Sequence, residues 1–244
     1  MANELPLFYR DLVPFDSTAH ASLTFPKTLT NFKFAAQTNL IPVFIGELAD
    51  ASRHYPLVFI PTGENQAPVL TAVVGVGDGV NRFVNADGQW REGCYIPAYV
   101  RRYPFIALRN DNNADAQLSL GFDKSAEGLG APDGDILVDE GGKPSERLEK
   151  IMQFEAEFQR NADVTREMAK QLQAAGVLEE SNLQMQLPGS TEAKTVSGFL
   201  MVNEKRLREL ADDKVLGLYK SDCLALAYGH LFSLGNISKL MNNA

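Results

Sequence analysis

Residues 55–105 read YPLVFIPTGENQAPVLTAVVGVGDGVNRFVNADGQWREGCYIPAYVRRYPF, and this stretch decides the fold that we expect. Residues 57–60 form a short apolar run, and residues 69–76 are rich in β-branched side chains, so both segments predict strands. Asp87-Gly88 lies between residues 82–84 and 89–91. Because glycine accepts a positive φ without a Cβ clash, this pair predicts a tight hairpin.

The segments on either side of these strands continue the β-rich pattern. Pro97 suits the first turn of a helix, where its missing N–H costs nothing, and Pro104 ends that helix after residues 98–103. The other elements expected in this half are a short helix at 43–53, strands at 105–109 and 117–122 joined by a polar loop at 110–116, and a surface loop at 123–143 with one strand at 136–138.

The period of the apolar residues changes at Pro144. Ser145 is a suitable N-cap, and apolar side chains then recur at helical spacing. Whether one long helix or two follow depends on residues 161–163, and Gly176 is a plausible C-cap. A β-rich return at 195–202 precedes three helices, for which the proposed caps are Asn203, Asp212 and Ser221.

These patterns together predict an α+β fold. We expect an antiparallel, twisted sheet in the N-terminal half, packed against helices of the C-terminal half. The expected division is residues 1–143, β-rich with short helices, and residues 144–244, mainly helical. Both parts are expected to share one core, because neither carries enough apolar surface alone.

Composition restricts the classes of function. The chain has 244 residues with a formal charge of -8, which argues against nucleic-acid binding because a phosphate footprint needs clustered Lys and Arg. Cys94 and Cys223 are the only cysteines, and we interpret both as free thiols. The N-terminus lacks a Sec signal pattern, and no run approaches the ~20 apolar residues of a membrane span. The chain is therefore expected to be cytoplasmic.

No catalytic or metal-binding motif stands out. The three histidines, His20, His54 and His230, are not in metal-ligand spacing, although they could converge in space. The acidic residues 133, 135, 139 and 140 lack the EF-hand spacing and are expected to serve turns. Glycines 75, 77 and 79 lack the third spaced glycine of a dinucleotide loop. We therefore expect no cofactor, no metal and no catalytic residues.

The best candidate for a ligand-binding site is the second part of the opening stretch. Guanidinium groups bind carboxylates and phosphates in a bidentate way and stack on aromatic rings. The alternative is an internal Arg–carboxylate pair that holds the short helix to the sheet, and breaking a buried pair costs about 3–5 kcal/mol. The candidate ligand-binding residues are Trp90, Tyr95, Tyr99, Arg101, Arg102 and Tyr103.

The same stretch resembles the SapC family of bacterial proteins. The resemblance rests on the NRFVNADGQW turn followed by YIPAYVRRYPF, on FKFAAQTNLIPVFIGEL at residues 32–48, on TREMAKQLQAAGVL at 165–178, and on GHLFSLGNISKL at 229–240. It implies a surface-layer association, from which the family takes its name, and an accessory role beside flavin-dependent halogenase-like proteins and TonB-dependent receptors. It implies no catalytic residues.

Three hypotheses about function follow. The first is a non-enzymatic, SapC-like binding or accessory protein that recognises a polypeptide or a small anionic ligand. The second is a structural or secretion partner of a surface layer, which would reach the surface by a non-Sec route. The third is a metal-dependent enzyme whose residues converge from distant segments.

Overall fold

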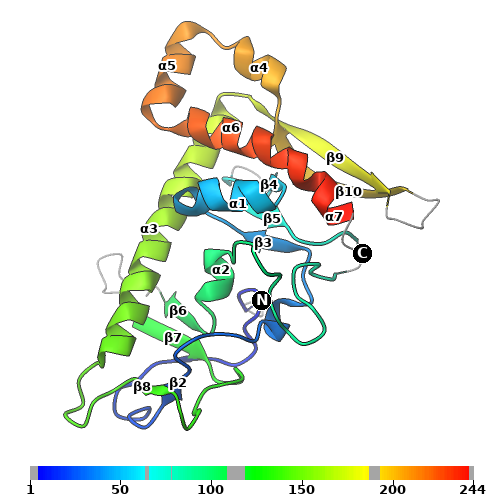
Figure 1. The fold of residues 1–244 in the computed structure, drawn as a ribbon. Coiled ribbons are helices and arrows are strands. Elements are labelled where there is room, and N and C mark those ends of the chain that lie inside the picture. The colour runs from blue at the N-terminus through cyan, green and yellow to red at the C-terminus, as the bar shows by residue number, and fades with distance from the viewer. Residues whose placement is uncertain (1–4, 64–65, 78, 109–118, 187–192, 242–244) are drawn as a thin grey trace. The chain divides into compact units, whose positions relative to one another are not determined.

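The computed structural model describes residues 5–63, 66–77, 79–108, 119–186 and 193–241. Its helices and antiparallel strands confirm the predicted α+β class (Figure 1). The chain forms two compact units, and each is assembled from two separate segments. The first unit comprises Met1–Thr30 and Val100–Arg160, and the second comprises Asn31–Tyr99 and Asn161–Ala244. The boundary at residues 143 and 144 stays a prediction.

The first unit contains a three-stranded antiparallel sheet and a small ribbon. The sheet has the order β1 (Leu12–Pro14), β7 (Ser119–Asp123), β6 (Phe105–Leu108), and the ribbon pairs β2 (Thr24–Phe25) with β8 (Asp135–Ile136). Strands of both segments thus bring their apolar side chains together. The buried core consists of Phe25, Phe105, Phe122, Leu137, Val138 and Leu148.

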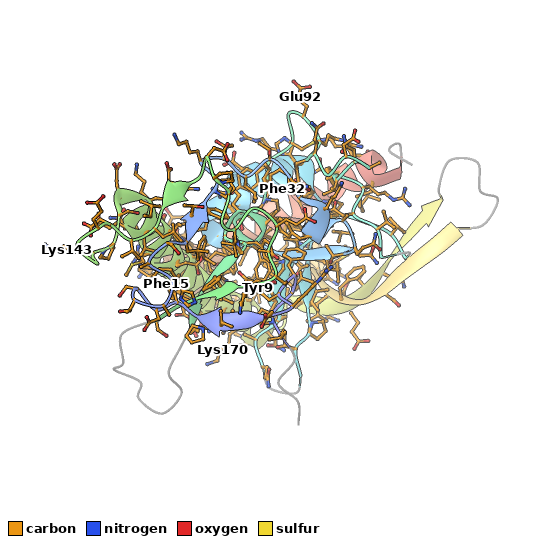
Figure 2. The ribbon with its side chains drawn as sticks, turned by 90° about the horizontal axis from the view of Figure 1, so that it is seen from below. Tyr9, Phe15, Phe32, Glu92, Lys143 and Lys170 are labelled. Atoms are coloured by element: carbon orange, nitrogen blue, oxygen red, sulfur yellow. The ribbon has the colours of Figure 1, made fainter. Side chains whose placement is uncertain are left out.

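Aromatic side chains extend this core toward the N-terminus. Tyr9, labelled in Figure 2, donates a hydrogen bond from its hydroxyl to the carbonyl of Phe105 over 2.5 Å. Its ring meets the edge of Tyr103 with the centroids 5.4 Å apart. Phe15 makes a similar edge contact with Phe122. These contacts hold the N-terminal segment on the sheet, because a buried tyrosine needs a partner for its hydroxyl.

The second unit contains a five-stranded antiparallel sheet. Its order is β3 (Leu40–Pro42), β5 (Val69–Val73), β4 (Leu57–Ile60), β10 (Ala193–Val202), β9 (Leu178–Gln186). The predicted strand at 57–60 is confirmed, and the predicted return at 195–202 lies inside β10. Strand β9 was not predicted, because its sequence LEESNLQMQ has few β-branched or aromatic residues. Two strands from the C-terminal half therefore complete a sheet begun in the N-terminal half.

A single helix, α3 (Glu146–Ala174), follows the first unit's strands and continues into the second unit. This settles the choice between one helix and two. The Ser145 hydroxyl caps it as predicted, accepting a hydrogen bond from the Leu148 N–H at 3.3 Å. The remaining helical elements are η1 (Lys33–Ala35), η2 (Ile45–Glu47), α1 (Leu48–His54), α2 (Ala98–Arg101), α4 (Glu204–Arg208), α5 (Asp212–Lys220), α6 (Cys223–Ser233), η3 (Leu234–Asn236) and α7 (Ile237–Met241).

Several predicted boundaries differ from the structure. The Asp87-Gly88 turn forms, but its flanks make one isolated bridge, Val84 to Trp90, instead of two strands. Asn203 caps α4 as predicted, whereas Asp212 is the first residue of α5 and not its cap. Asp222, with φ 56°, takes the cap position before α6 in place of Ser221. The predicted loop at 110–116 lies outside the described residues.

Among the helices in the described part of the chain, none is both long enough and apolar enough to cross a membrane.

Candidate functional site

Arg102, one of the predicted ligand-binding residues, forms a buried ion pair with Glu155 in the first unit. Its Nε donates to Oε1 over 3.2 Å, and its terminal nitrogen contacts Oε2. Both side chains are only 3% exposed. The Phe158 ring lies 3.8 Å from the guanidinium carbon, and the Ala107 N–H donates to Oε2 over 2.8 Å. Burial raises the pKa of Glu155, and Arg102 opposes that shift.

Tyr103 is held in a similar way by a buried carboxylate of the first unit. Its hydroxyl donates to Oδ2 of Asp123 over 3.2 Å, and burial raises the pKa of Tyr103. Asp123 also accepts the backbone N–H groups of Arg10 at 2.8 Å and Asp11 at 3.1 Å. Burial acts to raise the pKa of Asp123, but these bonds and those from Ser125 bring it below its ordinary value.

Arg101 is the exposed guanidinium of the predicted set. Its central carbon lies 5.4 Å from the centroid of the Phe154 ring, which belongs to α3 in the first unit. A guanidinium can stack on an aromatic ring and also bind a carboxylate or a phosphate in a bidentate way. This residue could therefore contact a carboxylate or a phosphate.

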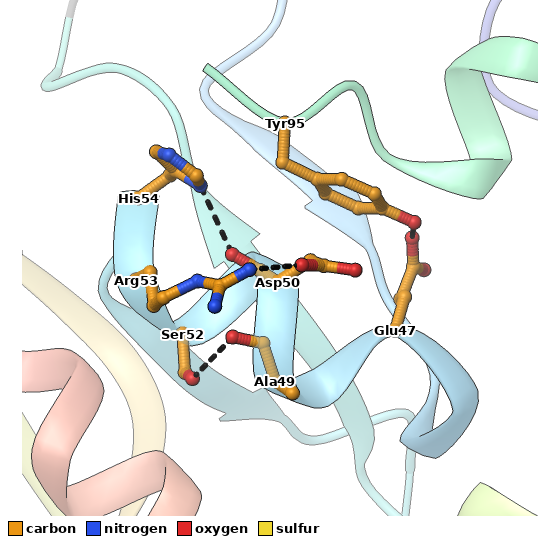
Figure 3. A network of polar contacts seen from close by, with 7 residues as sticks. All are labelled: Glu47, Ala49, Asp50, Ser52, Arg53, His54 and Tyr95. Carbon is orange, nitrogen blue, oxygen red and sulfur yellow. Dashed lines mark hydrogen bonds and ion pairs between the residues drawn. The ribbon is translucent and has the colours of Figure 1, made fainter. Parts of the chain in front are cut away.

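Trp90, Tyr55, Tyr95 and Glu47 form a chain of hydrogen bonds in the second unit. The Trp90 indole N–H donates to the Tyr55 hydroxyl over 3.2 Å, and that hydroxyl donates to the Tyr95 carbonyl. The Tyr95 hydroxyl in turn donates to Oε2 of Glu47 over 2.8 Å (Figure 3). The same carboxylate oxygen accepts the Ala98 N–H at 2.7 Å. The chain fastens the segment from Trp90 to Ala98 onto η2 and α1.

The predicted residues are therefore divided between the units. Trp90, Tyr95 and Tyr99 belong to the second unit, and Arg101, Arg102 and Tyr103 belong to the first. Trp90, Arg102 and Tyr103 are buried, whereas Tyr95 and Tyr99 are half-buried. Glu92, on the loop after Trp90, points outward in Figure 2.

The three histidines are divided between the two units. His20 packs edge-on against Phe122 in the first unit, whereas His54 and His230 lie in the second. His230 is fully buried, and burial lowers its pKa to about 4. Cys94 and Cys223 are free thiols, as predicted. Within the described residues, no group of three or more His, Cys, Asp or Glu side chains is placed to hold a metal ion.

A cavity of about 390 Å³ lies in the second unit where β10 bulges. The register between β10 and β9 shifts between Val196 and Phe199, and Gly198 adopts φ +86°, which only glycine accepts readily. The neighbouring β4 pairs with β10 at Leu200 and ends at Ile60. The lining residues are Pro61, Glu180, Ser181, Asn182, Ser197, Gly198 and Phe199.

The first unit has a cavity of about 460 Å³ beside its β2–β8 ribbon, lined in part by Ser17, Ser22, Asp139 and Glu140. The Asp139 carboxylate accepts the N–H groups of Gly141 at 2.9 Å and Lys143 at 2.8 Å. This confirms the predicted use of Asp139 in a turn. Because its Oδ1 accepts hydrogen bonds from two backbone N–H groups, the Asp139 carboxylate fixes the conformation of this loop.

The model of one family, SapC, matches residues 15–240. The chain belongs to the SapC family. No curated protein and no solved structure matches it. In this SapC chain the YIPAYVRRYPF motif supplies Tyr95, Ala98, Arg102 and Tyr103, which are the residues that bind the buried carboxylates described above.

The SapC chain also contains functional candidates that sequence reasoning missed. Glu155 is buried among the apolar side chains of α3, and a carboxylate in an apolar stripe is a sign of a buried partner. Ser197-Gly198 interrupts the β-rich return, and glycine inside a strand is a sign of a bulge. Glu180 carries no such local signal, because its strand has a polar sequence.

Proposed function

We propose that this SapC-family chain is a non-enzymatic accessory protein that binds a polypeptide in extended conformation along the open edge of β10. The proposal is supported by the short pairing between β4 and the much longer β10. Among the described strands, β4 pairs with β10 at Leu200, so the edge of β10 from Ala193 to Phe199 has β9 on one side only. An extended peptide adds to such an edge through main-chain hydrogen bonds.

The bulge cavity would provide specificity for one side chain of that polypeptide. Phe199 and Pro61 form an apolar part of its lining, and Glu180 contributes an exposed carboxylate. A lysine or arginine side chain could lay its methylene groups on the apolar part and direct its charge toward Glu180. The net charge of -8 favours the approach of a basic segment. We therefore propose a polypeptide with a basic residue among alternating apolar and polar ones.

In this proposal the aromatic and arginine residues of the family motif have a structural role and do not bind the polypeptide. Their hydrogen bonds and ion pairs fix the segment from Trp90 to Tyr103, and a ligand of Arg102 would have to displace Glu155 from a buried pair. Displacing a partner from such a pair costs about 3–5 kcal/mol. We propose that the bound polypeptide belongs to a halogenase-like or TonB-receptor-linked system, as the family resemblance implies, or to a surface layer.

Binding of a designed peptide tests the proposal. The probe is a fluorescein-labelled Thr-Val-Thr-Val-Lys-Val-Thr peptide, followed by fluorescence anisotropy, beside the same peptide with glutamate in place of lysine. Glu180→Gln should weaken binding of the lysine peptide about fivefold, as expected for a partly exposed ion pair of about 1 kcal/mol. Gly198→Val should weaken it further, because valine strains the bulge.

Glu149→Gln is the matched control, since Glu149 is an exposed glutamate on the part of α3 that belongs to the first unit, whereas β10 belongs to the second unit. It should leave the affinity unchanged. Equal binding of both peptides, or wild-type affinity in both the Glu180→Gln and Gly198→Val variants, would remove the proposal.

A small anionic ligand at Arg101 is the second candidate function. The favourable observation is the exposed Arg101 guanidinium held over Phe154. Calorimetric titration with citrate tests it, with Arg101→Gln expected to abolish the heat of binding and Arg101→Lys to reduce it. Heats that do not change in Arg101→Gln would reject this candidate without affecting the peptide proposal.

A further inference from the structure

Helix α6, η3 and α7 run end to end as one helical rod at the C-terminus (Figure 1). Residues 223–238, CLALAYGHLFSLGNIS, contain no Asp, Glu, Lys or Arg, although 22% of the chain is charged. An ordinary surface helix has one apolar face and one charged face. A helix without charges over sixteen residues is instead expected to be covered on more than one side.

One side of the rod is buried within the second unit. Leu226 and Ala227 are fully buried, and α6 packs against α1. The contact is close at Gly229, where an added Cβ would come within 2.7 Å of the Leu48 side chain. Asn236 donates from its side chain to the carbonyl of Ser52 over 2.7 Å, which fixes the rod along α1.

The opposite side of the rod is exposed and apolar. Phe232 is 77% exposed and Tyr228 is 37% exposed. Their rings stack with centroids 6.2 Å apart, one turn from each other along the helix. Ala225 and Gly235 continue the same exposed face toward the two ends. Exposed aromatic pairs on an uncharged face are typical of protein–protein interfaces, where Tyr and Phe are enriched and charges are depleted.

We propose that this face, defined by Ala225, Tyr228, Phe232 and Gly235, is covered by the same face of a second copy of the chain in antiparallel orientation. A two-fold axis between Tyr228 and Phe232 places Tyr228 of one copy on Phe232 of the other. It also places Ala225 opposite Gly235, so small residues meet at both ends. The spacing of three and four residues along the face is that of a helix-packing seam.

Charge at the ends of the face selects the antiparallel arrangement. Asp222 and Lys239 are both exposed, and they stand just beyond the two ends of the uncharged face. The Lys239 ammonium donates one of its three N–H groups to the carbonyl of Arg53 over 2.7 Å, which holds its charge at this end of the rod. Antiparallel pairing brings Asp222 of each copy to Lys239 of the other, whereas parallel pairing would place like charges together. Two copies that each have a charge of -8 repel one another. Self-association is therefore favoured through an uncharged contact surface that has complementary charges at its two ends. The proposal is independent of peptide binding.

Sedimentation velocity over a range of protein concentrations tests whether two copies of the chain form a dimer. The wild-type chain should dimerise, and Phe232→Ser and Tyr228→Ser should each raise the dimer dissociation constant at least about tenfold, as for central aromatic residues of an interface. Tyr219→Ser is the matched control, since Tyr219 is a 68% exposed tyrosine on α5 outside the face. It should leave the dissociation constant unchanged. A wild-type chain that stays monomeric, or an equal effect of Tyr219→Ser, overturns the proposal.

Charge reversal distinguishes this dimer from any other. Asp222→Lys and Lys239→Asp should each weaken self-association, because each variant places like charges at both ends of the seam. Mixing the two variants should restore a dimer that contains one of each, since both ends are then complementary again. Thermal melting of each variant checks its fold. Failure of the mixture to form the mixed dimer would exclude the antiparallel second copy, and recovery of dimers only with another protein would assign the face to that partner.

Discussion

Arg102 and Glu155 lie 53 positions apart in the sequence and form a two-point ion pair that is almost completely buried in the first unit. The guanidinium is covered by the Phe158 ring, and the carboxylate also accepts the Ala107 N–H. One carboxylate therefore connects α3 to the segment that leads into β6. Arg102 in the RRYPF part of the family motif is explained by this pairing without any ligand.

Removal of Glu155 should be strongly destabilising. Glu155→Ala leaves the Arg102 charge buried without its partner, so we expect the free energy of unfolding to fall by about 3–5 kcal/mol. Replacing both residues, as in Arg102→Met with Glu155→Leu, should recover most of that loss. Urea denaturation measures all three values. Glu146→Gln, which breaks an exposed pair with Lys150, is the control and should leave the free energy of unfolding nearly unchanged.

Asp123 should be a second stability centre of the first unit. It accepts hydrogen bonds from the backbone of Arg10 and Asp11 and from the Tyr103 hydroxyl. Asp123→Ala leaves these donors unsatisfied, and each such group costs about 1–3 kcal/mol. Asp123→Asn keeps one acceptor oxygen and should lose less. A melting temperature that is equal in the two variants would contradict this role.

His230 should make the second unit sensitive to acid. Its Nε2 accepts the Val202 N–H over 3.1 Å, and burial lowers its pKa from 6.5 to about 4. Between these two pKa values the unfolded chain binds a proton that the folded chain does not, so the free energy of unfolding rises with pH across this window. The contribution of neutral His230 is fully present above the unfolded pKa of 6.5 and is lost below pH 4. The full effect is roughly 3 kcal/mol. His230→Gln should flatten the slope in denaturation curves recorded from pH 4 to 7. An unchanged slope would show that other groups cause it.

Two glycines should respond to alanine in opposite directions. At Gly75 an added Cβ would lie 1.9 Å from the carbonyl oxygen of Val80, so Gly75→Ala must displace backbone and should cost about 2–3 kcal/mol or more. At Gly217, within α5, an added Cβ meets nothing within 4 Å. Gly217→Ala should therefore stabilise the chain by about 0.5–1 kcal/mol. Thermal unfolding of both variants provides the comparison.

Local features of the fold were predictable where the signal is local. The strand at 57–60, the Ser145 and Asn203 caps and the Asp87-Gly88 turn each depend on a few neighbouring residues. Strand β9 was missed because its polar sequence becomes a strand only through pairing with β10. The assembly of each unit from two separate segments depends on contacts between distant residues, which no short stretch of sequence records.

The candidate site was predicted less completely for the same reason. The motif from Trp90 to Tyr103 supplies all of the predicted ligand-binding residues, but its partners Glu47, Asp123 and Glu155 are distant in sequence. Buried carboxylates can be suspected from a sequence, as at Glu155, yet which cation or N–H they meet is decided by the fold. The cavity beside Glu180 depends on where β4 ends relative to the bulge in β10.

Amide hydrogen exchange with and without the lysine-containing peptide tests the central claim most directly. Peptide bound along β10 should slow exchange of the backbone N–H groups between Ala193 and Phe199, because they gain hydrogen-bond partners on the edge that β4 leaves open. Residues 90–103 should exchange at the same rate in both states. Slowed exchange at 90–103 with no change along β10 would contradict the account.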